Sequence, residues 1–266
     1  CDTISDRDRR HGTLQPFALL RQADIVVTGL CKSYSSGPVL SDVSFRLFQG
    51  EAVSLVGANG SGKTSLLRCC LRLTEPEAGQ ITVLDKDMRR LRGRALRRHR
   101  GRVALIWQKH HLVPRLSVLS NVIHGALARS TNPMVWRQGI APTAMREEAL
   151  GYLNRVGIVH LAKRRADSLS GGESQRVAIA RALMQRPRIV FADEPVASLD
   201  PRVGEEVMQL FFDLIKKQAL TLLFVSHNLD HALAYSDRII GLTHGRIELD
   251  DLSQSLNKRT IQRIYG

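Results

Sequence analysis

The chain has 266 residues and a formal net charge of +14, and 43% of its residues are hydrophobic. This length suffices for one large domain or two lobes with a shared core, and no apolar run is long enough to span a membrane. The positive charge would suit a nucleic-acid binder, but aromatic residues make up only 5% of the chain. Few side chains could therefore stack on bases, and nucleic acid is an unlikely partner.

The basic residues concentrate in two segments. One surrounds Arg7–Arg10, within residues 1–22, which are polar and without periodicity and which we expect to form a flexible basic tail. The other is residues 86–102, whose arginines suit a solvated helical face or a contact with lipid headgroups. The four cysteines show no Cys-x-x-Cys spacing and are expected to be reduced thiols.

The sequence pattern of the first half of the chain predicts strands with one helix. A turn at 35–38 separates two β-like segments, and the apolar run that ends at Gly57 is typical of a buried parallel strand. A helix with an apolar side is predicted over residues 63–73. The strands predicted in this half are residues 25–27, 39–48, 52–56, 81–84 and 103–107.

The middle of the chain changes character. Residues 117–168 contain no convincing strand, whereas 118–128 and 145–156 have helical spacing, so we predict a helical insert over about 109–168. After it, strands are predicted over 189–192, 220–225 and 238–242, and helices over 172–185, 203–218 and 230–235. Strands that alternate with helices predict a mostly parallel sheet covered on both faces.

Residues 57–64, GANGSGKT, fit the phosphate-loop pattern G-x-x-x-x-G-K-[ST] between a predicted strand and a predicted helix. Its glycines let backbone N–H groups approach the phosphates, and the helix N-terminus adds positive charge. Lys63 is expected to reach the β- and γ-phosphates of ATP, and Thr64 to bind Mg²⁺. The nucleotide-binding residues predicted here are Gly57, Ala58, Asn59, Gly60, Ser61, Gly62, Lys63, Thr64 and Ser65.

Residues 188–194 have another buried-strand pattern, which ends in two acids, Asp193 and Glu194. The strand would deliver Asp193 to the phosphate end of the sheet, where its carboxylate could hold Mg²⁺. Glu194, at the exit of the strand, could orient or deprotonate the attacking water as a general base.

Residues 169–173, LSGGE, resemble the signature of ATP-binding-cassette ATPases, and the resemblance extends over residues 25–250. It implies an α/β phosphate-loop NTPase fold, with a mostly parallel core sheet, an antiparallel β subdomain and a helical subdomain. We accordingly expect an ATPase domain over 23–250 and a C-terminal tail over 251–266.

The same resemblance implies further site residues. Gln108 matches the glutamine that meets Mg²⁺ and the attacking water, and His227 matches the histidine that contacts the γ-phosphate. Tyr34 is similar in position to the aromatic residue that stacks on adenine. Ser170, Gly171 and Gly172 of the signature, and Asp200 of the segment 198–200, would act across the interface of a homodimer in which each ATP lies between two chains.

Within that family the chain looks most like the ATP-binding subunits of phosphonate importers. The similarity is carried by residues 107–121, 180–185 and 192–201 and by the segment around Trp136. It implies a permease that docks on residues 109–125, an extracytoplasmic solute-binding protein, and a peripheral position on the cytoplasmic face of the membrane.

Two departures from that pattern leave other functions open. Residues 109–111, Lys-His-His, are more polar than expected, and Glu173 replaces a frequent Gln. A different importer, an exporter, or a cassette in a soluble complex therefore stay as alternatives to phosphonate import.

Overall fold

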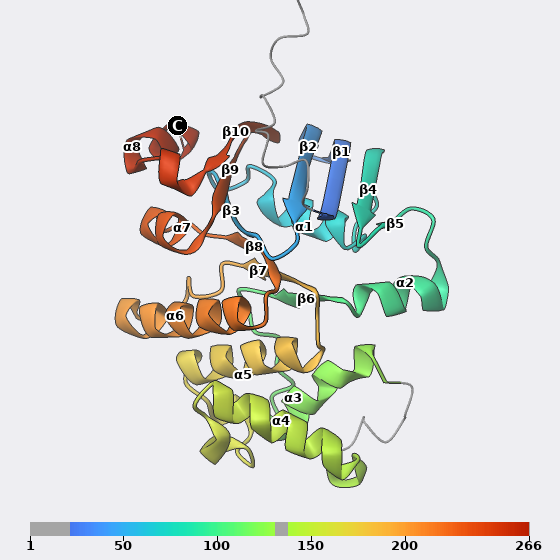
Figure 1. Cartoon of the computed structure of the whole chain (residues 1–266), viewed down its shortest axis with the longest axis vertical. Coiled ribbons are helices and arrows are strands. Elements are labelled where there is room, and N and C mark those ends of the chain that lie inside the picture. The colour runs from blue at the N-terminus through green and yellow to red at the C-terminus, as the bar shows by residue number, and fades with distance from the viewer. Residues whose placement is uncertain (1–21, 131–137, 266) are drawn as a thin grey trace, which may run out of the picture.

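The computed structural model of the chain describes residues 22–130 and 138–265 (Figure 1). The N-terminal tail predicted for residues 1–22 and the segment around Trp136 lie almost entirely outside the described residues.

A six-stranded sheet forms the centre of the described structure, in the order β10-β9-β3-β8-β7-β6. All neighbouring strands pair in parallel except β10, which is antiparallel to β9 at the edge. The strands are β3 (Ala52–Val56), β6 (Val103–Ile106), β7 (Ile189–Asp193), β8 (Thr221–Val225), β9 (Arg238–Thr243) and β10 (Arg246–Leu252). Every residue of β3, β7 and β8 is buried, which explains their uninterrupted apolar sequences.

Alternate residues of the central strands face two different cores. In β7, Val190 and Ala192 join one cluster, while Ile189 and Phe191 join the other. The first cluster includes residues of α5 (Gly171–Met184) and α6 (Pro201–Lys217), and the second those of α1 (Lys63–Cys70). The sheet is thus covered on both faces, as the alternation of strands and helices predicts.

A second, antiparallel sheet packs over the α1 side, in the order β2-β1-β4-β5 (upper right in Figure 1). Its strands are β1 (Ala23–Tyr34), β2 (Gly37–Phe48), β4 (Ala78–Val83) and β5 (Lys86–Asp87). The predicted hairpin over 25–48 is the β1–β2 pair, in which Tyr34 pairs with Gly37 at the turn.

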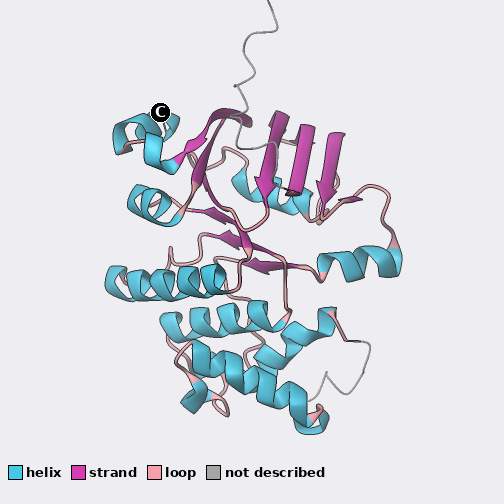
Figure 2. Cartoon of the chain, viewed as in Figure 1, coloured by secondary structure: helices cyan, strands magenta, loops and turns pink. Residues whose placement is uncertain are grey.

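Helices gather on the opposite side of the molecule, as Figure 2 shows. They are α3 (Val118–Ile123), η2 (His124–Ala128), η4 (Gln138–Ile140), α4 (Thr143–Arg155), η5 (Val159–Leu161) and η6 (Ala166–Ser168). Residues of α3, η2, α4 and η5 pack with α5 into the core cluster on the lower face of the sheet. The helix predicted over 118–128 is divided, because η2 continues α3 as a 3₁₀ turn.

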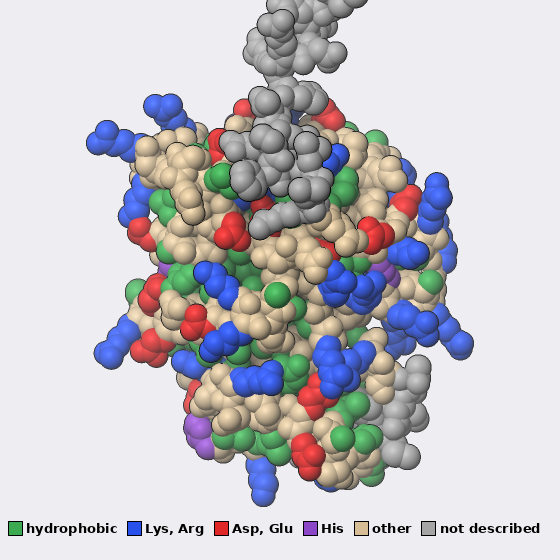
Figure 3. Space-filling model, in the orientation of Figure 1, with side chains coloured by type: hydrophobic (Ala, Val, Ile, Leu, Met, Phe, Trp, Pro, Cys, Tyr) green, Lys and Arg blue, Asp and Glu red, His purple; other side chains and the backbone are tan. Residues whose placement is uncertain are grey.

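Part of the basic cluster, including Arg94, Arg97 and Arg98, lies on α2 (Gly93–Arg100), in the segment predicted as a solvated helical face or a contact with lipid headgroups. His99 anchors α2, since its buried Nε2 lies 2.8 Å from the backbone oxygen of Val83. Arg94, Arg97 and Arg98 are exposed, and Figure 3 shows Lys and Arg side chains gathered at the right, where Figure 1 has α2.

The chain ends with α7 (Leu229–Tyr235), η7 (Ser253–Ser255), α8 (Lys258–Gln262) and η8 (Arg263–Tyr265). The domain boundary predicted at residue 250 falls inside β10. Beyond it, Ile261 and Ile264 are buried in one cluster with Val56 and Ile239, so the segment that was predicted as a tail packs on the core. Across the two described ranges, no helix combines the length and the apolar character needed to cross a bilayer.

Candidate nucleotide site

The phosphate loop leaves β3 at Gly57 and enters α1 at Lys63. Gly57 has φ 148° and Gly62 has φ 106°, both in the region that disfavours side chains. A Cβ on Gly57 would lie 2.2 Å from the backbone oxygen of Leu242, and one on Gly62 would lie 2.8 Å from that of Val39. Glycine at these two positions lets neighbouring backbone close around the loop.

The side chain of Lys63 folds back into this loop. Its Nζ donates to the backbone oxygens of Gly57 and Ala58, at 2.8 Å each. Burial lowers the pKa of Lys63, and the carboxylates of Glu194 and Asp193 act in the opposite direction. The ammonium group is therefore held among carbonyl oxygens beside two acids, and a phosphate could replace the carbonyls as its partner.

Asp193 ends β7 next to Thr64, the second residue of α1. The hydroxyl of Thr64 donates to Oδ2 of Asp193 at 2.9 Å. Burial raises the pKa of Asp193, while the hydrogen bond from Thr64 lowers it. Two oxygens from different elements thus meet at the start of the helix, and hydroxyl and carboxylate oxygens are the donors that Mg²⁺ prefers.

Glu194 turns away from the strand that carries Asp193. Its φ of 51° is left-handed, an uncommon conformation for a residue with a side chain. Its Oε1 lies 2.6 Å from Nε2 of His227, which follows β8. The structure thus brings together two of the three residues predicted to act in catalysis, and Gln108 is not in contact with this pair through any described hydrogen bond.

The hydroxyl of Ser61 is independent evidence that the phosphate loop can hold a phosphate group. Oγ of Ser61 is buried and has no hydrogen-bond partner among residues 22–130 and 138–265. Buried hydroxyls in proteins are nearly always hydrogen-bonded, and the neighbouring glycines leave backbone N–H groups at the same loop. These groups could hold the phosphates of a nucleotide.

Two predicted residues lie at the edge of this group. Gln108 is exposed just after β6. Tyr34 is 40% exposed at the tip of the β1–β2 hairpin, and Nζ of Lys32 lies 5.1 Å from its ring centroid. No described hydrogen bond or ion pair joins either side chain to the phosphate loop.

The signature segment forms the N-terminus of α5. Ser170 caps the helix, because its Oγ accepts from the backbone N–H of Glu173 and Glu173 Oε2 accepts from the backbone N–H of Ser170 at 2.7 Å. Hydrogen bonds from the backbone N–H and from the side chain of Ser170 to the carboxylate lower the pKa of Glu173. A Cβ on Gly172 would lie 2.6 Å from Cγ1 of Val203, so the signature packs tightly on the start of α6.

Asp200 caps α6 in turn, accepting from the backbone N–H of Arg202 at 3.0 Å. Ser170, Gly171 and Asp200 are exposed. In the described part of the chain, no hydrogen bond or ion pair connects these residues to Lys63, Thr64 or the acids. The predicted site residues therefore form two separate groups on one chain.

Tyr265 lies outside every motif of the sequence, and its hydroxyl donates to the backbone oxygen of Ser226 at 3.3 Å. Ser226 directly precedes His227. The apolar spacing of Ile261, Ile264 and Tyr265 was a signal for a packed helical turn at this end of the chain.

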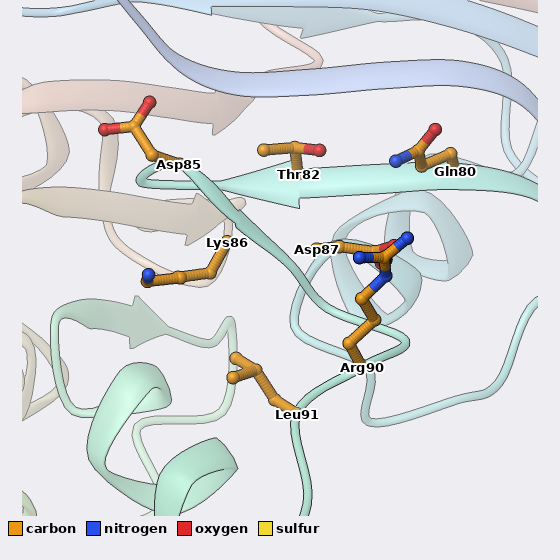
Figure 4. A pocket seen from close by; sticks show the side chains of 7 residues that line it. All are labelled: Gln80, Thr82, Asp85, Lys86, Asp87, Arg90 and Leu91. Carbon is orange, nitrogen blue, oxygen red and sulfur yellow. Dashed lines mark ion pairs between the residues drawn. The ribbon is translucent and has the colours of Figure 1, made fainter.

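A separate pocket of about 420 Å³ lies on the antiparallel sheet (Figure 4). Thr82, Asp87 and Arg90 are among its lining residues, and Nε of Arg90 lies 3.4 Å from Oδ2 of Asp87. None of the residues predicted for the nucleotide site lines this pocket.

Comparison with known proteins adds to this geometry. A family model described as ABC transporter matches residues 40–197. A phosphonates import ATP-binding protein of Frankia casuarinae is 44% identical over 240 residues, which cover 89% of this chain and 94% of that protein. A protein of the same description from Ruegeria sp. is 42% identical over 242 residues, covering 90% and 93%.

Solved structures agree with these matches. The dimeric ATP-binding cassette MJ0796, in a post-hydrolysis state bound to ADP and Pi, superposes with a TM-score of 0.76 at 30% identity, covering 86% of this chain and 98% of that one. CbiO1 from Clostridium perfringens, part of an ABC transporter complex, has a TM-score of 0.77 at 26% identity, covering 91% and 94%. The phosphate loop, the two acids and the signature all lie within the matched residues, and the chain belongs to the ABC transporter family.

Proposed function

We propose that this chain is the ATP-hydrolysing subunit of an importer of phosphonates or related phosphorus oxyanions. The observation that carries the proposal is the meeting of Lys63, Asp193 and the Glu194–His227 pair at the carboxyl ends of β3, β7 and β8. The names of the relatives at 42–44% identity support the cargo.

In this proposal the phosphate loop, residues 57–65, holds the phosphates of ATP. Thr64, Asp193 and Gln108 are the residues that would hold Mg²⁺. The metal ion would neutralise charge on the β- and γ-phosphates. Tyr34 would stack on adenine. It is exposed at the tip of the β1–β2 hairpin, and β2 approaches the phosphate loop at Val39.

Glu194 is proposed as the general base. Its carboxylate acts electrostatically on Lys63, and no described hydrogen bond or ion pair joins it to Lys63 or Thr64, so it can accept a proton from the attacking water. The short contact with Nε2 of His227 orients that carboxylate. A neutral imidazole has a single N–H, so with ATP bound His227 would share this donor between the Glu194 carboxylate and the γ-phosphate.

The exposed signature group is proposed to serve a second copy of the chain. Ser170 and Gly171 are exposed at the N-terminus of α5, a 14-residue helix, while Gly172 is buried next to them against Val203. Helix N-termini favour phosphate. Because no described hydrogen bond or ion pair joins them to the phosphate loop of their own chain, the γ-phosphate that they would bind would belong to a site on the partner, with Asp200 at the same interface.

A groove of about 680 Å³ suits the permease. It separates α2 and β6 from η2 and α5, and Trp107, His111 and His124 are among its lining residues. Arg181 stabilises one wall by donating to the backbone oxygens of His110 and His111, at 2.6 and 2.7 Å. We propose that a cytoplasmic segment of the permease occupies this groove, next to Gln108.

That arrangement would place the chain on the cytoplasmic face of the membrane, where ATP is available. The permease would carry the cargo across, and an extracytoplasmic solute-binding protein would deliver it.

The test is to purify the tagged chain from detergent-solubilised membranes and to reconstitute the complex in liposomes. We expect a polytopic membrane protein to co-purify, and we expect ATP to drive uptake of a labelled alkylphosphonate more strongly than of sulfate. Recovery with soluble enzymes alone would refute transport, while uptake of an unrelated solute would refute only the cargo.

A further inference from the structure

The C-terminal turn of the described chain reaches the back of the catalytic pair. Tyr265 donates its hydroxyl hydrogen to the backbone oxygen of Ser226 at 3.3 Å. Ser226 is 7% exposed and directly precedes His227, whose Nε2 lies 2.6 Å from Oε1 of Glu194. One hydrogen bond therefore connects the end of the chain to the turn that carries His227.

The segment that presents Tyr265 is held by contacts of its own. Ile261 and Ile264 are buried with Val56, the last residue before the phosphate loop. The hydroxyl of Thr243, in β9, donates to the backbone oxygen of Ile264 at 3.2 Å. Because these contacts fix η8 without the tyrosine hydroxyl, removal of that hydroxyl should leave the segment in place.

The phenol of Tyr265 is suited to act as a permanent donor. Burial raises its pKa, and the carboxylate of Glu194 adds to the rise, while a hydrogen bond from the backbone of Gly57 acts in the opposite direction. The hydroxyl is thus protonated at neutral pH, and it lies where the phosphate loop and the turn at Ser226 come together.

We propose that Tyr265 is a positioning residue for ATP hydrolysis, which fixes the backbone at Ser226 and thereby keeps His227 aligned with Glu194. No described hydrogen bond joins its hydroxyl to either of those side chains, so it acts through the turn. Alignment of reacting groups is sensitive to displacements of about 1 Å. The inference rests on the proposed function, because it concerns the same reaction.

Tyr265→Phe tests this directly in the full chain. We expect kcat for ATP hydrolysis to fall roughly 2- to 10-fold, as for the loss of a hydrogen bond. The contact of the hydroxyl with the Gly57 backbone is lost as well, but Lys63 and Thr64 are unchanged, so KM for ATP should change less than about 2-fold. If Tyr265 had a merely structural role, kcat would not fall selectively while KM for ATP stayed nearly constant.

Tyr235→Phe is the matched control. The hydroxyl of Tyr235 donates to Glu205 at 2.5 Å and to Gln209 at 3.2 Å, both on α6 and away from the catalytic pair. It should keep the wild-type kcat. In a His227→Ala background, the additional change Tyr265→Phe should leave the residual rate unaltered, because the group that Tyr265 aligns is gone.

An unchanged kcat in Tyr265→Phe, an equal loss in the Tyr235→Phe control, or an undiminished loss in the His227→Ala background would overturn the inference. Wild-type turnover in the same assay distinguishes a failure of the proposed function from a failure of the role proposed for Tyr265. Absence of wild-type hydrolysis would refute the proposed function, whereas normal hydrolysis by both wild type and Tyr265→Phe would refute only the part given to Tyr265.

Discussion

Asp193 and Glu194 are sequence neighbours in different environments. Asp193 is buried and bonded to Thr64, whereas Glu194 leaves the strand in a left-handed conformation and pairs with His227. This difference suits one acid for holding a cation and the other for accepting a proton. The sequence predicted both positions because they follow locally from the end of one strand, but the contact of Glu194 with His227, 33 residues away, needed the fold.

Glu194→Gln should keep ATP binding and remove most of the hydrolysis, because the amide preserves shape but cannot accept the proton. We expect kcat to fall at least about 100-fold, with the Kd for ATP within a few-fold of wild type. Steady-state phosphate release and equilibrium nucleotide binding measure the two effects. Wild-type turnover in this variant would remove Glu194 as the base.

Lys63→Ala should weaken nucleotide binding about 10- to 100-fold, since one charge-assisted hydrogen bond to the phosphates is lost. The matched control is Lys86→Ala, which removes an exposed lysine on β5. Titration with a fluorescent ATP analogue gives both constants. Equal affinities in the two variants would contradict the phosphate-loop assignment.

The helices differ in how well their sequences predict where they begin and end. The S-x-x-E pattern of residues 170–173 is a local capping box, and α5 begins within one residue of its predicted start. The division of the helix predicted over 118–128 into α3 and η2 does not follow from the local sequence. A Cβ on Gly125 would lie 2.2 Å from the backbone oxygen of Arg181, so contact with α5 decides the conformation there. With only five residues, α8 is too short for its periodicity to be recognised.

Glu148 on α4 links two arginines that flank the end of α5. Its carboxylate lies 2.6 Å from Nη2 of Arg129 and 2.7 Å from Nε of Arg186. Burial raises its pKa, but the hydrogen bonds from Arg186 and Arg129 outweigh this, and the pKa of Glu148 is lowered. The stabilisation is therefore present above the unfolded-state pKa of about 4.3 and is lost as the pH falls through the lower folded-state value.

Glu148→Gln should lower the free energy of unfolding by about 0.5–1 kcal/mol at pH 7. The difference from wild type should shrink towards zero at about pH 3, where the wild-type carboxyl group is protonated in most unfolded chains and an increasing share of folded ones. Urea denaturation at both pH values measures it. A difference that stays constant with pH would show that the ion pairs contribute nothing.

Two separate groups of predicted site residues lie on the chain, and we propose that each is half of an ATP site. Lys63 and the acids sit at the carboxyl end of the central sheet, and the signature sits exposed at the start of α5. The sequence predicted both sets of residues from motifs, and the sheet and its helices from alternation. It could not predict that 253–265 pack on the core, because their partners Val56 and Ile239 are remote in the chain.

The association of two copies around ATP is the central claim of this account. The most direct measurement is the mass of the Glu194→Gln chain in solution by light scattering, with and without ATP and Mg²⁺. We expect ATP to double the mass, and we expect no doubling when Lys63→Ala is added. A chain that binds ATP at saturation and stays a monomer would contradict the account.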